Sequence, residues 1–284
     1  MHNNTNLKFK SDIEEQFTSL EIQYDEQREL AWYMMNEKPR PCFTANLIEE
    51  IRLGFNEIME GNINNIDHIV LASNTPGTFN LGGDLALFKS LVLEKNREAL
   101  LEYALASIVP LFLFHTGLGK NITTISLVQG DALGAGFEAA ISGDVLIAEK
   151  SARMGLPEVL FNMFPGMGAY SFLSRKASVS LADKMILGGK LYSAEELYEL
   201  GIVDILVEDG CGEKAVYDYI RKEQRSKNTY KAIRRAKRCC NPVSFDELSE
   251  IATIWVDAIL QLGEKELRIM ERLISRQSAK ANNQ

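Results

Sequence analysis

A glutamate set among glycines is the first feature of this sequence that could carry chemistry. Glu138 closes the segment GAGFE at 134–138, which follows an apolar run and opens a helical pattern. The same segment fits Gly-x-Gly-x-x-Ala, a loose form of the turn that holds a dinucleotide pyrophosphate at a helix N-terminus. That turn requires an acidic residue about 20 positions further on, whereas Glu149 follows Gly134 by only fifteen. The spacing therefore disfavours a dinucleotide site and leaves Glu138 as a candidate reacting group.

A second glutamate and a second glycine turn extend this candidate site. The turns FNLGGDL at 79–85 and ALGAGFE at 132–138 each follow a run typical of a buried strand, and Glu158 lies on a further turn. Glycine turns leave backbone N–H groups free to point at one atom, so two adjacent turns can form an oxyanion hole. Close packing, with Glu138 in a capping or salt-bridging role, is the simpler explanation for either turn alone.

Composition and charge narrow the functional class. The chain has 284 residues, 46% of them hydrophobic, and a formal net charge of −8. That charge argues against a general nucleic-acid binder, which needs many cationic contacts to phosphates. The four cysteines lack metal-site spacing and the three histidines are scattered, so we expect no metal. The most apolar run, Ala104–Phe114, is too short to span a bilayer, and no signal peptide is evident, so we expect a cytoplasmic protein without membrane insertion.

Residue patterning predicts an α/β core followed by helices. Runs typical of strands occur at 19–25, 30–36, 67–73, 122–128, 144–150 and 202–208. The first two of these runs could pair as a hairpin, and helical periodicity separates several of the others. We expect three regions: a flexible N-terminus at 1–16, a core at 17–210 and a helical C-terminal region at 211–284.

Three motifs, taken together, resemble those of the crotonase (enoyl-CoA hydratase/isomerase) superfamily. The superfamily's first glycine turn reads Phe-x-Ala-Gly-Ala-Asp, and residues 79–84 read FNLGGD. Its second reads Gly-x-Ala-x-Gly-Gly-Gly-x-Glu, and residues 130–138 read GDALGAGFE. Its third begins Pro-Glu and ends Pro-Gly-x-Gly, as does PEVLFNMFPGMG at 157–168. The resemblance covers roughly residues 20–275 and implies a spiral of ββα units with a helical C-terminal region, assembled as a trimer.

The resemblance also implies roles for individual residues. Glu138 and Glu158 occupy the two catalytic glutamate positions. The oxyanion donors would be the backbone N–H groups of Gly82 and Ala135, with a shift of one residue in either turn left open. No cofactor is implied, because the substrate arrives as a thioester of acyl carrier protein or of coenzyme A.

Departures from the commonest superfamily sequence point to one branch. The segment GMGAYSFLSRKAS replaces the usual Gly-x-Gly-Gly-Thr-Gln-Arg-Leu of hydratases. The three motif regions are similar to those of the diffusible signal factor synthases of Gram-negative bacteria. That similarity implies dehydration of a 3-hydroxyacyl thioester to the cis-2-enoyl thioester, followed by hydrolysis to a free fatty acid signal. It further implies a regulatory partner, a sensor protein's domain.

Two other functions stay open at this point. One is an enoyl-CoA hydratase of fatty-acid β-oxidation, which would use the same site on a 2-enoyl-CoA. The other is a binding module whose glutamates are vestigial and which regulates a signalling partner. Only the signal synthase releases a free acid.

A fatty acyl chain would need an apolar slot. Met167 beside the second carboxylate, and Trp255 and Leu273 in the C-terminal region, are the candidate lining residues. Ordinary core packing explains each of them equally well.

One helix face in the C-terminal region carries four cations. Lys231, Arg234, Arg235 and Arg238 have the spacing of neighbours on a helix. A solvated face is the simpler interpretation, and docking of an acidic carrier protein or of a coenzyme A phosphate is the functional one.

Overall fold

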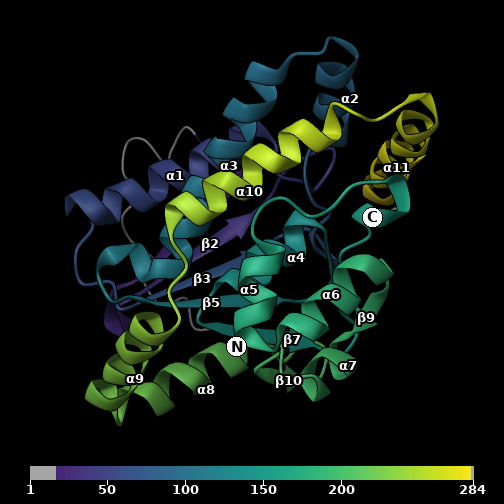
Figure 1. Cartoon of the computed structure of the whole chain (residues 1–284). Coiled ribbons are helices and arrows are strands. Elements are labelled where there is room, and N and C mark those ends of the chain that lie inside the picture. The colour runs from purple at the N-terminus through teal and green to yellow at the C-terminus, as the bar shows by residue number, and fades with distance from the viewer. Residues whose placement is uncertain (1–16, 283–284) are drawn as a thin grey trace.

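The computed structural model describes residues 17–282. The predicted flexible segment, 1–16, lies outside the described residues. The rest of the chain forms two sheets wrapped by helices (Figure 1). This mixed α/β architecture is the one that the sequence predicted.

The larger sheet has the strand order β1-β2-β3-β5-β7-β10. Its first two strands form the predicted antiparallel hairpin, and the other neighbouring strands pair in parallel. Their bounds are β1 (Leu20–Asp25), β2 (Leu30–Met35), β3 (His68–Ser73), β5 (Thr123–Val128), β7 (Val145–Glu149) and β10 (Ile205–Val207).

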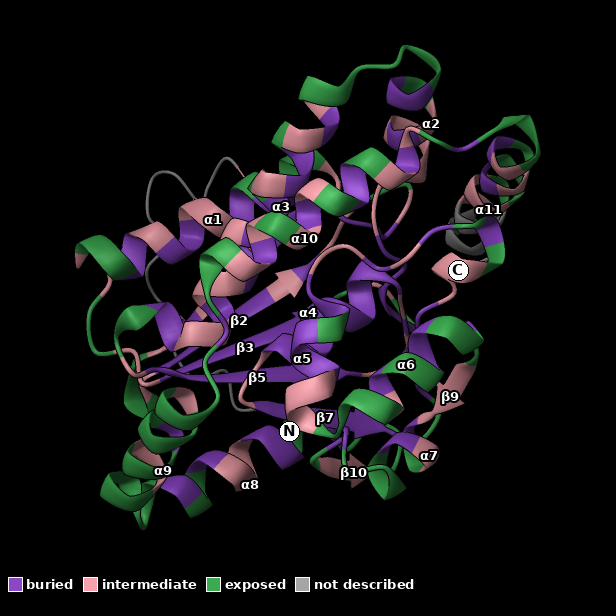
Figure 2. Ribbon diagram, viewed as in Figure 1, coloured by how far each residue is buried: buried purple, intermediate pink, exposed green. Residues whose placement is uncertain are grey.

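The two faces of this sheet bury different clusters, because successive strand residues point to opposite sides. On β2, Tyr33 packs in the larger core, whereas Trp32 packs in a smaller cluster with Val216 of α8 (Gly212–Gln224). The larger core is also filled by α1 (Ala45–Glu60) and α3 (Arg97–Thr116), which lie across the sheet from α8 (Figure 1). The central strands are buried along nearly their whole length (Figure 2).

The smaller sheet determines where the glycine turns lie. It has the order β4-β6-β8-β9, from strands β4 (Thr78–Asn80), β6 (Asp131–Leu133), β8 (Arg153–Gly155) and β9 (Leu191–Ser193). Strands β4 and β6 pair in parallel, and each runs directly into one of the two turns. Parallel pairing brings both turns to the same end of the sheet, side by side.

Two helices follow the first turn, α2 (Leu85–Leu93) and α3. Among the described residues, α3 with the turn after it is the one helix long and apolar enough to cross a membrane. In this structure α3 packs against α1 and α10 (Phe245–Ile259), with Leu100 and Ile108 fully buried. That is the position of a core helix.

The C-terminal region is helical, as predicted, and splits between two places. Helices α8 and α9 (Lys227–Cys240) lie near one end of the sheet, while α10 and α11 (Glu264–Asn282) return to pack on α3 and α2 (Figure 1). Four further helices complete the core: α4 (Ala135–Ser142), α5 (Ala169–Lys176), α6 (Val179–Gly188) and α7 (Ala194–Glu199).

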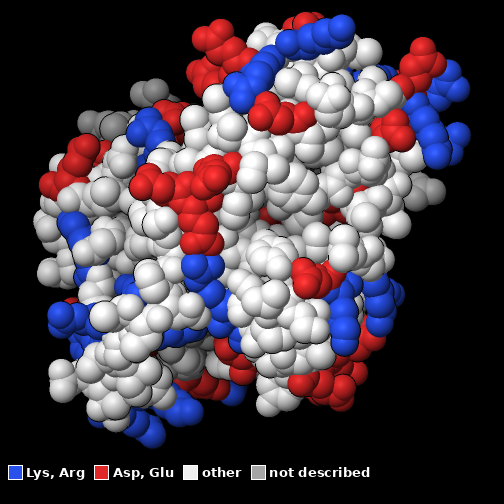
Figure 3. All heavy atoms as spheres, viewed as in Figure 1, with Lys and Arg blue, Asp and Glu red and all other residues white. Residues whose placement is uncertain are grey.

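The basic residues predicted to form one face do lie on α9, but they do not form a face that is free for solvent or for an acidic partner. Arg234 is buried against Glu223, with the shorter of two hydrogen bonds at 2.7 Å. The other two paired cations bond to acids of distant loops, Lys231 to Asp67 and Arg238 to Asp144. Arg235 remains exposed. Lysine and arginine do gather over α8 and α9 (Figure 3), but three of the four predicted cations pair with acids of α8 and of the loops that precede β3 and β7.

Candidate active site

The two glycine turns open onto one cavity of about 380 Å³. Both predicted glutamates line it, together with Gly83 from the first turn and Ala135 from the second. Helices α2, α10 and α11 contribute apolar side chains to the cavity wall, including Leu85, Phe88, Trp255, Ile259, Met270 and Leu273. The sequence motifs at 79–85, 132–138 and 157–168 thus converge on one space.

Glu138 is held by backbone groups of another segment. It lies in the first turn of α4, and its Oε1 accepts hydrogen bonds from the N–H groups of Met167, at 2.8 Å, and Ala169, at 2.9 Å. The side chain is almost completely buried. Burial raises the pKa of its carboxyl to about 7, and the two N–H donors oppose that rise. Glu138 is therefore poised to gain or lose a proton near neutral pH.

Glu158 lies directly over the second glycine turn. It begins the short 3₁₀ helix η4 (Glu158–Phe161), and a Cβ added to Gly134 would lie 2.3 Å from its Oε1. Gly134 also has a φ of 53°, so a side chain there would be strained as well as obstructed. Within the described residues, the buried Oε2 of Glu158 has no hydrogen-bond partner. Burial first, and the charge of Glu138 second, raise the pKa of Glu158 to about 8.

The first turn corrects one predicted oxyanion donor. The N–H of Gly82 donates to Oδ1 of Asn80 at 2.8 Å, and the N–H of Leu81 donates to the carbonyl of Pro41. Both of these N–H groups therefore already have acceptors, one in the turn itself and one in the loop before α1. The next residue, Gly83, lines the cavity, and no described residue accepts a hydrogen bond from its N–H. The N–H without an acceptor thus lies one position beyond the predicted Gly82, because the side chain of Asn80 accepts from Gly82.

The second turn matches its predicted donor more closely. Ala135 is the first residue of α4 and lines the cavity, and no described residue accepts from its N–H. A Cβ added to Gly82 would lie 3.6 Å from this nitrogen, which shows how near the two turns approach. A Cβ added to Gly136 would lie 2.2 Å from the carbonyl oxygen of Asn80. Glycine at 136 is thus what lets the turns meet.

The departure from alanine at position 83 has a steric reason. A Cβ there would lie 2.7 Å from the ring of Phe88, which fills the space that a methyl group would take. Phe88 also contacts the rings of Tyr103 and Trp255, at 5.0 and 4.9 Å between centroids. The Tyr103 hydroxyl donates to the carbonyl of Phe43 and ties this group to the start of α1. Neither Phe88 nor Tyr103 was predicted, because each reads as a regular apolar position of its helix.

All three predicted acyl-chain residues line the cavity. Met167 approaches from beside Glu138, and Trp255 and Leu273 from α10 and α11. Trp255 packs so closely on Gly166 that an added Cβ would lie 2.4 Å from its ring. The third motif and the C-terminal region therefore meet at one wall of the cavity.

The described residues contain no group of three or more histidine, cysteine, aspartate or glutamate side chains arranged to hold a metal ion. The site offers two carboxyl groups whose pKa values are raised toward neutral pH, two backbone N–H groups and an apolar wall. That set suits proton transfer next to a carbonyl whose oxygen gains charge.

Curated relatives match a part of the chain. The 2,3-dehydroadipyl-CoA hydratase of Escherichia coli K12 is 36% identical over 119 residues, 42% of this chain and 47% of that protein. The fatty acid oxidation complex subunit alpha of Pseudomonas syringae pv. tomato is 34% identical over 117 residues, 41% of this chain and 16% of that protein. The chain thus spans less than half the length of these curated relatives.

Solved structures match almost the whole fold. An enoyl-CoA hydratase from Bacillus halodurans superposes with a TM-score of 0.71 at 21% identity, covering 90% of this chain and 100% of that one. DspI from Pseudomonas aeruginosa superposes with a TM-score of 0.63 at 24% identity, covering 78% and 79%. The enoyl-CoA hydratase/isomerase family model matches residues 27–276. The chain belongs to the enoyl-CoA hydratase/isomerase family and has the crotonase fold.

Proposed function

We propose that this protein makes a cis-2-unsaturated fatty acid by dehydrating a 3-hydroxyacyl thioester and then hydrolysing the thioester. The observation that carries the proposal is the state of Glu158. Its carboxyl is buried against the cavity, has one oxygen without a partner among the described residues, and has a pKa of about 8. At neutral pH it therefore holds a proton that it can give to a leaving hydroxyl.

In the first step, the two glutamates exchange protonation states. Glu138, whose carboxyl has the lower of the two pKa values, takes a proton from C2 of the substrate. Glu158 gives its proton to the hydroxyl at C3, the C3–O bond breaks, and water leaves as the C2–C3 double bond forms. The thioester oxygen gains charge during this step, and the N–H groups of Gly83 and Ala135 donate to it.

In the second step, the same groups act in reverse. Glu158, now a carboxylate, takes a proton from a water molecule that attacks the thioester carbonyl. The tetrahedral oxyanion uses the same pair of backbone donors, each contributing roughly 3 kcal/mol by analogy with known oxyanion holes. Glu138 gives its proton to the departing thiolate, and both glutamates return to their starting states. Four proton transfers, two in each step, thus close the cycle without a cofactor.

The apolar wall supports a fatty acyl substrate. Met167, Trp255 and Leu273 would contact the chain, while the thioester carbonyl faces the two turns. We infer acyl carrier protein or coenzyme A as the carrier. A homotrimeric assembly, regulation by a sensor protein's domain and a cytoplasmic location stay predictions from the resemblance and the sequence.

A second candidate function is hydration of a 2-enoyl-CoA. It is favoured by the names of the relatives, which include a 2,3-dehydroadipyl-CoA hydratase and an enoyl-CoA hydratase. It would use the same glutamates and donors but would leave the thioester intact. The vestigial-site alternative finds no support in the geometry, because every predicted catalytic group lines one cavity.

Side-by-side assays separate these functions. We expect 3-hydroxyacyl carrier protein to yield free acid, and Glu138→Gln and Glu158→Gln each to lower that rate by at least about a hundredfold, as loss of a general acid or base does. The measurement is quantification of free 2-enoic acid by mass spectrometry, with 2-enoyl-CoA hydration assayed in parallel. Hydration without release of acid would favour the hydratase, and wild-type product formation by either variant would exclude the mechanism.

A further inference from the structure

The lining of the active-site cavity contains acidic side chains but no basic ones. Glu138, Glu158 and Asp131 contribute carboxyl groups, and none of the described residues along the cavity is a lysine, an arginine or a histidine. Arg40, which lies beside the first glycine turn, pairs with Asp84 at 3.0 Å and does not line the cavity. A negatively charged group that entered the cavity would therefore find no cation along its described walls.

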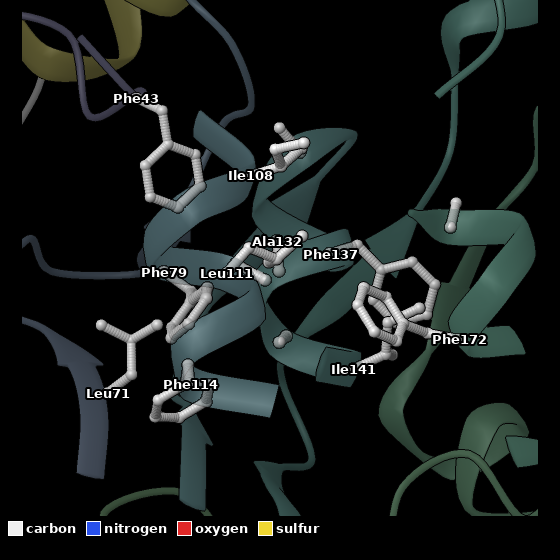
Figure 4. Close-up of a cluster of buried hydrophobic side chains, with 14 of the residues drawn as sticks. Phe43, Leu71, Phe79, Ile108, Leu111, Phe114, Ala132, Phe137, Ile141 and Phe172 are labelled. Carbon is white, nitrogen blue, oxygen red and sulfur yellow. The ribbon is translucent and has the colours of Figure 1, made fainter. Parts of the chain in front are cut away.

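Strand β6 turns the side chain of Asp131 toward the cavity. Asp131 and Leu133 line the cavity, whereas Ala132, between them, packs in the core on the other face of the strand. Figure 4 shows Ala132 among the buried hydrophobic side chains. This alternation is the normal one for a strand, in which successive side chains point to opposite faces. The N–H of Asp131 also donates to the carbonyl of Gly77 at 3.1 Å, which fixes the start of β6 beside the segment that leads into β4.

Asp131 lies within reach of the far end of a short acyl group. Leu133 directly precedes the second glycine turn, and two strand residues separate it from Asp131 by roughly 7 Å. With carbon–carbon bonds of about 1.5 Å, an extended acyl group of about six carbons spans a similar distance from the thioester. Neither of the two proposed reaction steps uses Asp131. At about pH 6 both glutamates hold protons, because their pKa values are about 7 and about 8, and Asp131 then supplies the formal negative charge of the described lining.

We propose that the active-site cavity selects against acyl groups that end in a carboxylate, and that Asp131 is the residue that sets this selection. The inference rests on the proposed function, since it defines the class of acyl group that the same site accepts, one whose far end is uncharged. Like charges repel strongly where little water separates them, and specificity often comes from such a repulsive contact. An apolar wall disfavours every polar end group. Asp131 adds a penalty that applies to negative charge alone.

Matched ligands separate the effect of charge from that of polarity. The probes are saturated 2-oxoalkyl-coenzyme A thioethers, which keep the carbonyl but cannot be dehydrated or hydrolysed. Their chains end either in a carboxylate or in a carboxamide of the same shape, and calorimetry at about pH 6 measures their dissociation constants. We expect the wild type to bind the carboxamide about tenfold more tightly than the carboxylate. Asp131→Asn keeps the shape of the side chain and removes its charge, so it should reduce this ratio to about twofold, through tighter binding of the carboxylate.

Two further variants complete the design. Asp131→Lys places a cation in the cavity and should reverse the preference, so that the carboxylate binds more tightly than the carboxamide. Asp246→Asn is the matched control, because it removes the same charge from an exposed position of α10 that does not line the cavity, and it should keep the wild-type ratio. Thermal unfolding of each variant verifies that it is folded.

The outcomes distinguish this selection from the function on which it rests. Equal binding of the two probes by the wild type would overturn the selection. A ratio in Asp131→Asn that equals that of the wild type would overturn the role of Asp131. Failure of the wild type to bind either probe, or a methyl-ended probe of the same length, would instead refute the thioester site itself, and the selection with it.

Discussion

Glu138 and Glu158 differ in how each carboxyl is held, although burial raises both pKa values. Glu138 accepts two backbone hydrogen bonds on one oxygen, which favour its charged form. Glu158 has no such compensation on Oε2 and also faces the charge of Glu138. The proton therefore resides preferentially on Glu158, which is the starting state that the dehydration step requires.

The raised pKa values predict that stability falls as pH rises. Both groups titrate near 4.5 when exposed and near 7 and 8 when folded, so the folded state binds these protons more tightly. This contribution to stability is complete below about pH 4.5 and is lost as pH rises through about 8. Glu158→Gln removes one charge that the fold must bury. We expect this variant to melt on the order of 5 °C above the wild type at about pH 8.5, with a smaller difference at about pH 5.

Thermal unfolding at the two pH values measures this effect. Glu208→Gln, on the surface, is the control and should not change the pH dependence near neutrality. A wild type and Glu158→Gln that lose stability in parallel as pH rises would show that Glu158 is ionised in the fold.

The position of Gly134 predicts a second residue-scale effect. A methyl group there would meet Oε1 of Glu158 and would force a side chain into a conformation with φ of 53°. Displacing a reacting carboxyl by about 1 Å can lower a rate by about a hundredfold. We expect that loss of kcat/KM in Gly134→Ala. Gly188→Ala is the control, because no atom lies within 4 Å of its added Cβ, and it should keep wild-type activity. Equal activity of the two variants would contradict the placement of Glu158.

At the scale of elements, α9 is held by charges rather than by apolar burial. Its one buried residue is Arg234, which pairs with Glu223 on α8, and Glu223 in turn accepts from Thr123 of β5 at 2.8 Å. Burial alone would raise the pKa of Glu223, but the nearby His68, whose Nε2 lies 3.6 Å from its Oε1, and the hydrogen-bonded Arg234 bring it down to about 2. Helix α9 therefore depends on the buried ion pair of Arg234 and Glu223.

Removing one member of this cluster should be strongly destabilising. Arg234→Met leaves the Glu223 carboxylate buried without its main partner, and a broken buried pair costs about 3–5 kcal/mol. Arg235→Met changes the next residue of the same helix, which is exposed, and should stay within about 0.5 kcal/mol. Urea unfolding at neutral pH measures both. A cost for Arg234→Met no larger than that of Arg235→Met would show that the cluster is not what holds α9.

The sequence predicted local features and missed those set by distant partners. The hairpin of β1 and β2 was predicted from the sequence, because its signals lie within a few residues. The basic face on α9 misled, since the acids that pair with it come from loops far along the chain. The sequence also did not reveal that the side chain of Asn80 accepts from the N–H of Gly82, the predicted donor.

At the scale of the whole molecule, the site is assembled from segments far apart in the sequence, from Leu81 to Leu273. Helices α10 and α11 close the cavity that β4 and β6 open, and α11 packs on α2 (Figure 1). The sequence offered Trp255 and Leu273 as candidate lining residues, and both line this cavity. The smaller sheet was not predicted, because three-residue strands carry no periodic pattern. Yet this sheet is what brings the two turns together.

The central claim is that one site both dehydrates a 3-hydroxyacyl thioester and hydrolyses it. The most direct test incubates the purified protein with 3-hydroxyacyl carrier protein in water enriched in the heavy oxygen isotope, and analyses the product by mass spectrometry. The mechanism predicts a free cis-2-enoic acid carrying one heavy oxygen in its carboxyl group, and its absence in Glu158→Gln. A product that stays bound to the carrier as a 2-enoyl thioester, with no labelled free acid, would contradict the claim.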